Sequence, residues 1–348
     1  AWSSMLIVDG RVYTQEQVGE NEAVVCLDAE SGHRVWEHED KVRFWDGQSG
    51  AGPRATPAFV DGRLYTQGAT GVLSCLEASD GKVVWTRNIA DDSKAAVPMW
   101  GFSASPLVID GLVITYAGGP DDKGLLAYRA DNGEPAWSAP TGSVSYSSAQ
   151  PLEVDGQRQV LILSDDGLLA VDAATGKEAW RYDAPAKGIW RAVQPGVIGP
   201  ATVLIGSEDL GIVLLGVTPS GDGWNVEPRW TSKAMRPAYN DFVVQDGFLY
   251  GFDSNIFCCI DLETGKRKWK QGRYGHGQVV LLADQQLLLV TSETGEVVLL
   301  RATPDKHEEL GTIAAIHGKT WNHPAVVGNR LFVRNDEEIA FYRLPPAE

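Results

Sequence analysis

The sequence has little of what nucleic-acid binding and membrane insertion require. Its 348 residues hold only 30 Lys and Arg against 46 Asp and Glu, which gives a net charge of −16 at pH 7. Binding to nucleic acids and to anionic lipid headgroups depends on Lys and Arg, so this shortage of positive charge argues against both. The longest apolar runs, such as residues 287–290, fall far short of the ~20 residues of a membrane-spanning helix. We therefore expect no nucleic-acid partner and no transmembrane segment.

Histidine and cysteine are also scarce, with six His and four Cys in the chain. None of the His lies in a recognisable arrangement with Ser, Asp or Glu. A Cys-x-x-Cys-His sequence is missing, which excludes haem attached in that way. The sequence therefore predicts no catalytic residue and no metal ligand.

A segment of eleven residues that ends in Trp is present in five copies. The copies span residues 26–36, 75–85, 127–137, 170–180 and 259–269. With Trp230 included, the terminal Trp residues are 39 to 52 positions apart. This period excludes short helical repeats and fits a unit of about four strands. The chain is therefore built from copies of one supersecondary unit.

A second marker precedes each Trp: an Asp-Gly pair between two short runs in which apolar and polar residues alternate. The pairs begin at residues 9, 61, 110, 155 and 246, and weaker forms lie at 199, 284 and 328. Asp-Gly tolerates the positive φ angles of a two-residue hairpin turn. Eight hairpins at this spacing predict an all-β chain of eight four-stranded antiparallel sheets, an eight-bladed β-propeller. We expect residues 1–348 to form one domain, because a closed set of repeats uses the whole chain.

The repeat Ala/Cys-x-Asp-x-x-Thr/Ser-Gly-x-x-x-Trp resembles the tryptophan-docking repeat of the quinoprotein-type (PQQ-like) β-propellers. The resemblance spans nearly the whole chain, with good matches in five units. It implies that each Trp packs on the neighbouring blade near the Gly of that blade's repeat. The resemblance assigns this docking role to Trp36, Trp85, Trp137, Trp180, Trp230 and Trp269.

The resemblance also implies a place outside the bacterial cytoplasm. We expect the protein in the periplasm, with its signal peptide removed, or anchored to an envelope membrane through a segment upstream of Ala1. The last blade has room for only three strands, because Leu331–Arg334 and Ile339–Tyr342 are its last strand-like runs. We expect its missing outer strand to lie upstream of Ala1, with residues 1–4 at most beginning it, and an unpaired edge to remain.

The four cysteines are expected to be buried strand residues. Cys26, Cys75 and Cys259 occupy the repeat position where other copies have Ala. The adjacent Cys258 and Cys259 leave one alternative, because some quinoprotein alcohol dehydrogenases have a vicinal disulfide over their cofactor. Such a bond would distort the peptide that the strand ladder uses.

The segments between the predicted blades are long and varied, whereas the hairpin turns are short and uniform. Binding residues tend to lie on loops that a rigid scaffold holds, so a site is expected on these segments. They span residues 40–57, 89–106, 141–151, 184–195, 231–241, 272–279 and 315–324. Trp, Tyr and Arg are typical of binding hot spots, although each could also pack its own loop against the blade. The candidates of this kind, with one His, are Arg54, Trp100, Trp190, Arg191, Tyr239, His276 and Trp321.

A polar residue stands just before the first strand of each predicted blade. The eight are Ser4, Thr56, Ser105, Gln150, Gln194, Asn240, Gln278 and His323. First strands begin near the propeller axis, so these side chains should surround the mouth of the central channel. They could bind a ligand, or they could hold water and tie the channel shut, because polar groups on inner strands need partners.

Three functions fit these features to different degrees. The first is a non-catalytic scaffold that, as a monomer, presents its loops to an envelope protein or polymer. It is similar in kind to the propeller lipoprotein of the outer-membrane β-barrel assembly machinery, the BamB-like branch of the family. It needs no cofactor, and it accounts for the full set of repeats and the acidic surface.

The second function is a dehydrogenase of alcohols or sugars that uses pyrroloquinoline quinone and calcium, as the family name implies. Calcium takes six to eight oxygen ligands, and the candidate segments offer Asp46, Asp92, Asn240 and Asp241, together with Trp190 and Arg191. These residues do not have the spacing of a set of calcium ligands, and the chain is much shorter than the family's dehydrogenases.

The third function is a hydrolase or lyase with His276 or His323 as the base, but a lone His in a loop more often makes surface hydrogen bonds.

Overall fold

The structure is a computed structural model that describes residues 1–188 and 191–344. The chain separates into two compact units. The first holds Ala1–Val203 and Gly216–Glu227, and the second holds Leu204–Leu215 and Pro228–Glu348. The prediction of a single domain stays a prediction. Among the described residues, no helix has the length and apolar character needed to cross a membrane.

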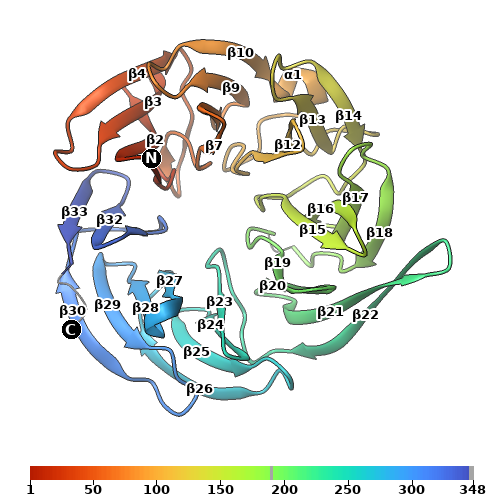
Figure 1. The fold of residues 1–348 in the computed structure, drawn as a ribbon, viewed down its shortest axis with the longest axis vertical. Helices are drawn as coiled ribbons and strands as arrows, with labels where there is room; N and C mark the ends of the chain where they lie inside the picture. The colour runs from red at the N-terminus through yellow and green to blue at the C-terminus, as the bar shows by residue number, and fades with distance from the viewer. Residues whose placement is uncertain (189–190, 345–348) are drawn as a thin grey trace. The chain divides into compact units, whose positions relative to one another are not determined.

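Four antiparallel four-stranded sheets follow one another in the first unit, each with its strands in chain order (Figure 1). The first has β1 (Leu6–Val8), β2 (Arg11–Val18), β3 (Asn21–Asp28) and β4 (Arg34–Asp40), and the second has β7 (Ala58–Val60), β8 (Arg63–Gln67), β9 (Val72–Glu77) and β10 (Val83–Asn88). The third has β11 (Leu107–Ile109), β12 (Leu112–Tyr116), β13 (Leu125–Arg129) and β14 (Pro135–Ala139), and the fourth has β15 (Gln150–Val154), β16 (Gln157–Ser164), β17 (Gly167–Asp172) and β18 (Glu178–Asp183). A small hairpin, β5 (Trp45–Asp46) and β6 (Gly50–Ala51), and one helical turn, α1 (Ile89–Ser93), lie in the segments between sheets.

The fifth sheet contains residues of both units, and three sheets follow it in the second unit. The fifth has β19 (Gly196–Gly199), β20 (Thr202–Ser207), β21 (Gly211–Ser220) and β22 (Gly223–Ser232), and the sixth has β23 (Val243–Gln245), β24 (Phe248–Asp253), β25 (Ile256–Asp261) and β26 (Arg267–Arg273). The seventh has β27 (Gln278–Leu282), the short 3-10 helix η1 (Ala283–Gln285), β28 (Leu287–Thr291), β29 (Glu296–Arg301) and β30 (Glu309–Ala314), and the last has β31 (Ala325–Val327), β32 (Arg330–Arg334) and β33 (Ile339–Arg343).

These eight consecutive sheets confirm the predicted fold class, an eight-bladed β-propeller. Seven sheets have four strands, and the last has three within the described residues, as the sequence predicts. The first four residues precede β1, and the backbone N–H groups of Trp2 and Ser3 both donate to the carbonyl of Pro53. The source of a fourth strand for the last sheet stays a prediction.

The Asp-Gly pairs form the hairpin turns that the sequence predicts. Asp9 and Gly10 have φ angles of 48° and 74°, and the other four pairs are alike. Positive φ at both central residues defines the type I′ turn, whose twist matches that of the flanking strands. The pair at 284 differs, because η1 takes the place of the two-residue turn there and Gln286 has the positive φ angle instead.

The repeated Asp-x-x-Thr/Ser-Gly stabilises the turn between the third and fourth strands. In the fourth sheet, one carboxylate oxygen of Asp172 accepts hydrogen bonds from the backbone N–H and the hydroxyl of Thr175. Gly176 then takes a φ of 71°, and its N–H donates to the carbonyl of Asp172. The Asp side chain thus replaces backbone partners, as in other turns of this kind.

The Gly of each turn also makes room for a Trp of the preceding sheet. A Cβ atom on Gly176 would lie 2.4 Å from the ring of Trp137, and Gly81, Gly133 and Gly265 are covered in the same way by the preceding Trp. The indole N–H of Trp137 donates to the carbonyl of Ala173, 3.2 Å away. The equivalent bonds join Trp36 to Ala78, Trp85 to Ala130, Trp230 to Leu262 and Trp269 to Thr303. Docking is therefore confirmed for these five Trp residues.

Trp180 behaves differently from the other five. Its ring is buried, but its N–H donates to the side-chain oxygen of Gln159 in its own sheet, at 2.7 Å. The fifth sheet lacks the Asp-x-x-Thr-Gly turn that would offer a carbonyl, so the indole turns to a local acceptor.

All four cysteines are free and buried, each in the third strand of its sheet. Cys258 and Cys259 follow each other in β25 without a bond between them. Burial raises the pKa of both thiols to about 12. The interpretation as buried strand residues is confirmed, and the vicinal disulfide is not formed.

Candidate functional site on the loops between the sheets

In the first unit, the polar residues that precede the first strands form a series of hydrogen bonds from sheet to sheet. The backbone N–H of Ser4 donates to the hydroxyl of Thr56 at 3.3 Å, and the N–H of Thr56 donates to the hydroxyl of Ser105 at 2.9 Å. The N–H of Ser105 donates in turn to Ser148, two residues before the predicted Gln150. Gln150 instead donates to the side-chain oxygen of Gln194. These bonds fit the role of tying neighbouring sheets together.

The second unit has a similar series built from amides. The side-chain N–H of Asn240 donates to the carbonyl of Gly277 at 2.6 Å, and the side chain of Gln278 donates to the carbonyl of Trp321 at 3.1 Å. His323 lies 3.4 Å from the carboxylate of Asp241. The predicted polar residues of this unit therefore contact the adjacent sheets, and ligand binding by any of them stays a prediction.

Arg54 holds the β5–β6 hairpin in place. Its guanidinium donates to Asp46 at 2.5 Å, to the hydroxyl of Ser49 and to the carbonyl of Gly50, and it covers the ring of Phe44. Its side chain is only 9% exposed, as is that of Asp46. Arg54 is therefore a positioning residue for this hairpin.

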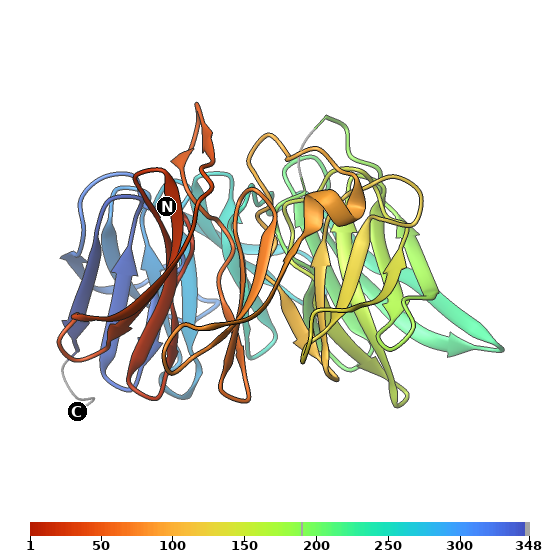
Figure 2. The same ribbon diagram turned by 90° about the horizontal axis from the view of Figure 1, so that it is seen from above.

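The hairpin presents Trp45, whose residue is 63% exposed. Figure 2 shows the hairpin in orange-red and the segment around α1 in orange, projecting on the same side of the first unit. The segment after α1 exposes Val97 and Met99, the latter at 64%. Trp100 follows and packs on Tyr146, with 4.9 Å between ring centroids. This unit therefore carries exposed apolar side chains on two successive loop segments, residues 40–57 and 89–106.

Glu22 lies beneath this hairpin as a buried carboxyl group. One of its oxygens accepts from the N–H of Ala69 at 3.1 Å, while the other is buried without a hydrogen-bond partner. Burial raises its pKa from 4.5 to about 7, the bond from Ala69 and the charge of Arg54 lower it, and the charge of Asp40 raises it. Glu22, Asp46 and Arg54 are called the hairpin cluster below.

The second unit brings three predicted residues together. The ring of Tyr239 stacks on His276, with 5.0 Å between centroids, and meets the edge of Trp321 at 5.3 Å. Glu293 accepts from the indole N–H of Trp321 at 2.8 Å and from the backbone N–H of His276 at 3.2 Å. The ammonium of Lys319 lies 4.5 Å from the Trp321 ring centroid. These five residues are called the aromatic cluster.

Two of its members were not predicted from the sequence. Glu293 lies in the turn between β28 and β29, and Lys319 lies beside Trp321. Turns between second and third strands share the loop side of a blade, so an acidic residue in such a turn was the available signal for Glu293. Burial, followed by the charge of Glu293, raises the pKa of Tyr239. Its hydroxyl therefore stays protonated and can donate to a ligand.

The two remaining loop candidates are Trp190 and Arg191. Arg191 is 1% exposed and donates to the carbonyl of Ala184, so its side chain supports the segment that holds it. Trp190 lies outside the described residues. Arg191 therefore has a structural role in its own loop, whereas Tyr239, His276 and Trp321 share one partly exposed cluster.

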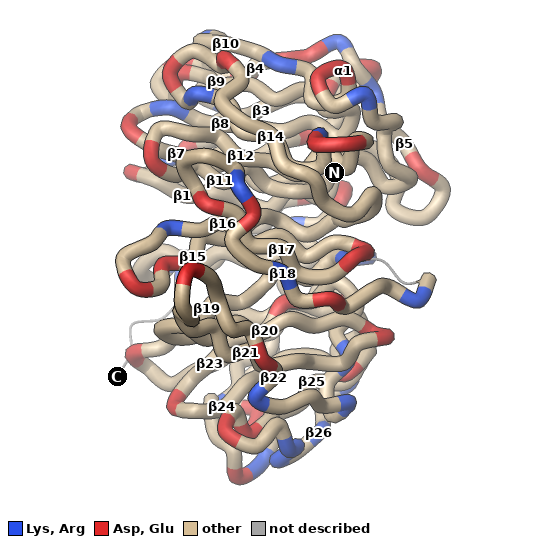
Figure 3. The backbone as a smooth tube through the Cα atoms, turned by 90° about the vertical axis from the view of Figure 1, so that its right-hand side faces the viewer, with Lys and Arg blue, Asp and Glu red and all other residues tan. Residues whose placement is uncertain are grey.

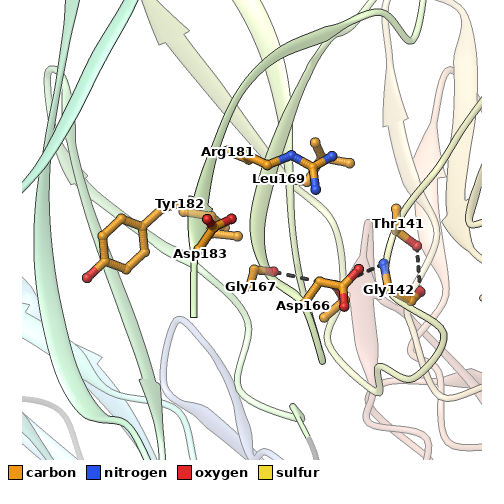
Figure 4. Close-up of a pocket in the computed structure, with 10 residues that line it drawn as sticks. Thr141, Gly142, Asp166, Gly167, Leu169, Arg181, Tyr182 and Asp183 are labelled. Carbon is orange, nitrogen blue, oxygen red and sulfur yellow. Dashed lines mark hydrogen bonds between the residues drawn. The ribbon is translucent and has the colours of Figure 1, made fainter. Parts of the chain in front are cut away.

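One pocket lies between the fourth sheet and the segment that precedes it, in the first unit (Figure 4). Thr141 and Gly142 line one side, and Tyr182 and Asp183 line the other. Its cavity volume is ≈ 10 Å³, which is room for about one water molecule. Arg181 at its edge is already paired with Glu178. The pocket is therefore too small to hold a cofactor.

A comparison with known families gives the chain its place. The sequence profile of the family described as outer membrane protein assembly factor BamB matches residues 20–271, well over half of the chain. The chain belongs to the BamB family. BamB of Burkholderia pseudomallei (strain K96243) is 24% identical over 293 residues, which cover 70% of this chain and 75% of that protein.

Solved structures show the same fold. The crystal structure of BamB from Moraxella catarrhalis matches with a TM-score of 0.69 at 15% identity, over 97% of this chain and 94% of that chain. Quinohemoprotein alcohol dehydrogenase ADH-IIG of Pseudomonas putida is also similar, with 30% identity over 218 residues. That match covers 53% of this chain but only 29% of the dehydrogenase.

The carboxylates of this BamB-family chain that could bind calcium do not form an open set of ligands. Asp46 is held by Arg54, and Asp92 accepts from Arg87 and Tyr128. Asp241 faces His323. Within residues 1–188 and 191–344, no three His, Cys, Asp or Glu side chains gather as metal ligands. The carboxylate oxygens that calcium would need are thus engaged by cations or N–H and O–H donors. The side-chain oxygen of Asn240 is buried without a hydrogen-bond partner, but one oxygen falls far short of the six to eight that calcium takes.

Proposed function

We propose that this protein is a non-catalytic scaffold of the cell envelope that binds a protein partner through the loops between its sheets. The single observation that carries the proposal is the aromatic cluster: Tyr239, His276 and Trp321 converge from three separate loop segments. Family membership supports a protein partner, and the same membership supports a periplasmic location. An envelope polymer is the competing ligand of the same loops.

The chemistry of the cluster suits protein recognition. Trp and Tyr supply large rigid contact surfaces, and they are enriched in binding hot spots. Glu293 fixes the Trp321 ring through its N–H, so little side-chain entropy remains to be lost when a partner binds. The exposed Trp45 and Met99 of the first unit offer further apolar contacts.

Site-specific photocrosslinking in cells tests the proposal. A photoreactive amino acid is placed at the exposed positions Trp45, Met99 and Lys319, and control positions are Asp61 and Asp155 in the hairpin turns. We expect the loop positions to yield adducts with the same envelope protein and the turn positions to yield none. Adducts from the turns alone, or adducts with glycan but no protein, would contradict the proposal.

Replacement of single Trp residues separates binding from folding. Trp321→Ala should weaken binding of the crosslinked partner by about 2 kcal/mol, roughly thirtyfold, with a small loss of stability. Trp137→Ala removes a docking residue, so it should lower the free energy of unfolding by about 3 kcal/mol and leave partner affinity of the folded protein unchanged. A large loss of stability in Trp321→Ala, with the partner affinity of the folded protein unchanged, would show that the aromatic cluster belongs to the core and would contradict the proposal.

A second candidate, a quinone-dependent dehydrogenase, is favoured only by the similarity to the quinohemoprotein enzymes. Addition of pyrroloquinoline quinone with Ca²⁺, followed by absorbance and Trp fluorescence, distinguishes the two. The scaffold proposal expects no stoichiometric binding and no dye reduction with alcohols or aldoses. Binding together with dye reduction would replace the scaffold by the enzyme.

A further inference from the structure

The outer strand of the sixth sheet, β26, has a charge opposite to that of the protein as a whole. It carries Arg267, Lys268, Lys270 and Arg273 and no acidic residue. The outer strand of the first sheet, by contrast, carries one Arg and three acids, in the sequence RVWEHED. Residues 228–273 hold eight Lys and Arg against five Asp and Glu. Figure 3 shows blue basic segments close to β26.

Three cations meet at one buried carboxylate on this sheet. Asp253, at the end of β24, is 2% exposed. Its oxygens lie 2.9 Å from Nε of Arg236, 2.9 Å from Nη2 of Arg267 and 2.5 Å from Nζ of Lys270. Arg267 also donates to the carbonyl of Ala234. The four charged residues, Arg236, Asp253, Arg267 and Lys270, are called the cationic cluster.

The cationic cluster has more positive charge than its carboxylate can balance. Among the residues that the structure describes, Asp253 is the one acid that pairs with Arg236, Arg267 or Lys270. Burial raises the pKa of Asp253, but the bonds from Lys270 and Arg236 outweigh it, so the pKa lies below its ordinary value. The carboxylate is therefore ionised at neutral pH, and two positive charges remain.

The cluster also has hydrogen-bond donors to spare. Both Nη atoms of Arg236 and Nη1 of Arg267 make no bond to the described residues, because the bonds of these side chains use Nε and Nη2. Arg236 is 47% exposed, so its outer edge faces solvent. Asp253 therefore holds the guanidinium groups of Arg236 and Arg267, and their remaining N–H groups are available to a ligand.

We propose that Arg236, Arg267 and Lys270 form a binding site for a phosphate group. A phosphate carries a charge of about −1.5 to −2 near pH 7 and three acceptor oxygens, which match the two uncompensated charges and the spare N–H donors. Guanidinium groups bind such anions through two parallel hydrogen bonds, which adds geometric selectivity. The phosphate can be free in solution or part of a lipid headgroup.

A purely protective role for the charges does not account for this geometry. Lys and Arg on an edge strand prevent pairing with other chains, and β26 is such a strand. That role requires cations on the strand alone, whereas Arg236 comes from the segment that follows β22. A buried acid that gathers cations from two segments is better explained by a site that orients them.

Titration of the whole protein with inorganic phosphate at low ionic strength tests the proposal, with binding followed by ³¹P NMR. We expect saturable binding that Arg236→Gln weakens about tenfold, since a hydrogen bond to a charged group is lost. Arg236→Gln keeps Arg267 and Lys270 on Asp253, so the fold is retained, and a thermal melt checks this. The double variant Arg236→Gln/Arg267→Gln should abolish the binding.

Lys268→Gln is the matched control. It removes one positive charge, as Arg236→Gln does, and it lies on β26 between Arg267 and Lys270, but Lys268 lies over the ring of Phe248 and takes no part in the cluster. It should leave phosphate affinity within about twofold of wild type. Equal weakening by Lys268→Gln and Arg236→Gln would show diffuse attraction and overturn the proposal, as would the lack of saturable binding or selective binding of a Glu-rich peptide.

Vesicles separate the two sources of the phosphate. Co-sedimentation with phosphatidylglycerol vesicles but not with phosphatidylcholine vesicles, reversed by inorganic phosphate and lost in Arg236→Gln, supports a lipid headgroup. Phosphate binding without co-sedimentation supports a soluble ligand. Co-sedimentation that Arg236→Gln leaves unchanged would contradict the assignment of this site.

Discussion

The hairpin cluster of the first unit and the cationic cluster of the second are opposite solutions to the same problem. Each centres on a buried charged side chain, Arg54 at 9% exposure in one and Asp253 at 2% in the other. The hairpin cluster sets one cation, Arg54, against Asp46 and Glu22, whereas the cationic cluster sets three cations against Asp253. One cluster has an excess of acid and the other an excess of base.

The difference shows how a buried excess charge can be removed. In the hairpin cluster, the extra acid takes up a proton, since burial raises the pKa of Glu22 to about 7. Arg residues keep their charge at any physiological pH, so the cationic cluster has no such route. Its excess has to be left facing water or be met by an external anion.

Arg54→Met breaks the hairpin cluster and should have the largest effect. Asp46 and Glu22 would lose the buried cation that faces them, so we expect a loss of about 3–5 kcal/mol in the free energy of unfolding. Urea denaturation measures it. The control is Arg43→Met on the same segment, an exposed residue paired with Glu20, which should cost less than about 1 kcal/mol. Equal losses would show that Arg54 is not the centre of the cluster.

Glu22→Gln tests, through the pH dependence of stability, whether the extra acid of the hairpin cluster takes up a proton. The folded-state pKa of about 7 is above the ordinary 4.5, so the protonated form stabilises the fold fully below 4.5 and this stabilisation is lost as pH rises through 7. Gln cannot ionise. We expect the variant to match wild type near pH 4.5 and to exceed it by up to about 3 kcal/mol at pH 8.5.

Denaturation curves of both proteins across this pH range measure the difference. Glu263→Gln, at an exposed position, serves as the control and should follow wild type at every pH. A constant difference between Glu22→Gln and wild type would mean that Glu22 is ionised throughout the range.

Asp253→Asn removes the only acid of the cationic cluster. The cations are partly exposed, so the expected loss is smaller than for a fully buried pair, about 2 kcal/mol. Added NaCl should restore part of the lost stability by screening the three like charges. Thermal melts at low and high salt measure this, and a loss that is independent of salt would contradict the charge-balance argument.

Lys270→Met should have the smallest effect. It removes one cation from a cluster that has two in excess, so relief of repulsion offsets the lost pair, and we expect a change within about 0.5 kcal/mol. Comparison of the stability losses of Lys270→Met and Arg54→Met then distinguishes a cation that the fold does not need from one that it needs. A large loss in Lys270→Met would show that the number of cations is required for folding rather than for binding.

The repeat allowed most of the fold to be predicted. The Asp-Gly turns and five docking Trp residues lie where the sequence places them, because each depends on residues close together within a unit or one unit apart. Trp180 was the exception. Its behaviour depends on a turn that the next unit lacks, and a pattern averaged over units does not report that.

The site could be predicted only in part. Tyr239, His276 and Trp321 were recognised by residue type and loop position, and the structure brings them together. Glu293, which holds two of them, was missed because it belongs to a hairpin turn rather than to a loop between sheets. Arg191 has a typical hot-spot residue type, yet the fold buries it.

The sequence by itself determined the succession of eight antiparallel sheets, the type I′ turns and the positions of the docking Trp residues. These depend on local dihedral preferences and on a fixed period, which are written in neighbouring residues. Only the tertiary structure decided which charges meet. Arg236, Asp253 and Lys270 are separated by 17 residues at each step along the chain, and charge balance at a buried atom depends on distance in space rather than on composition.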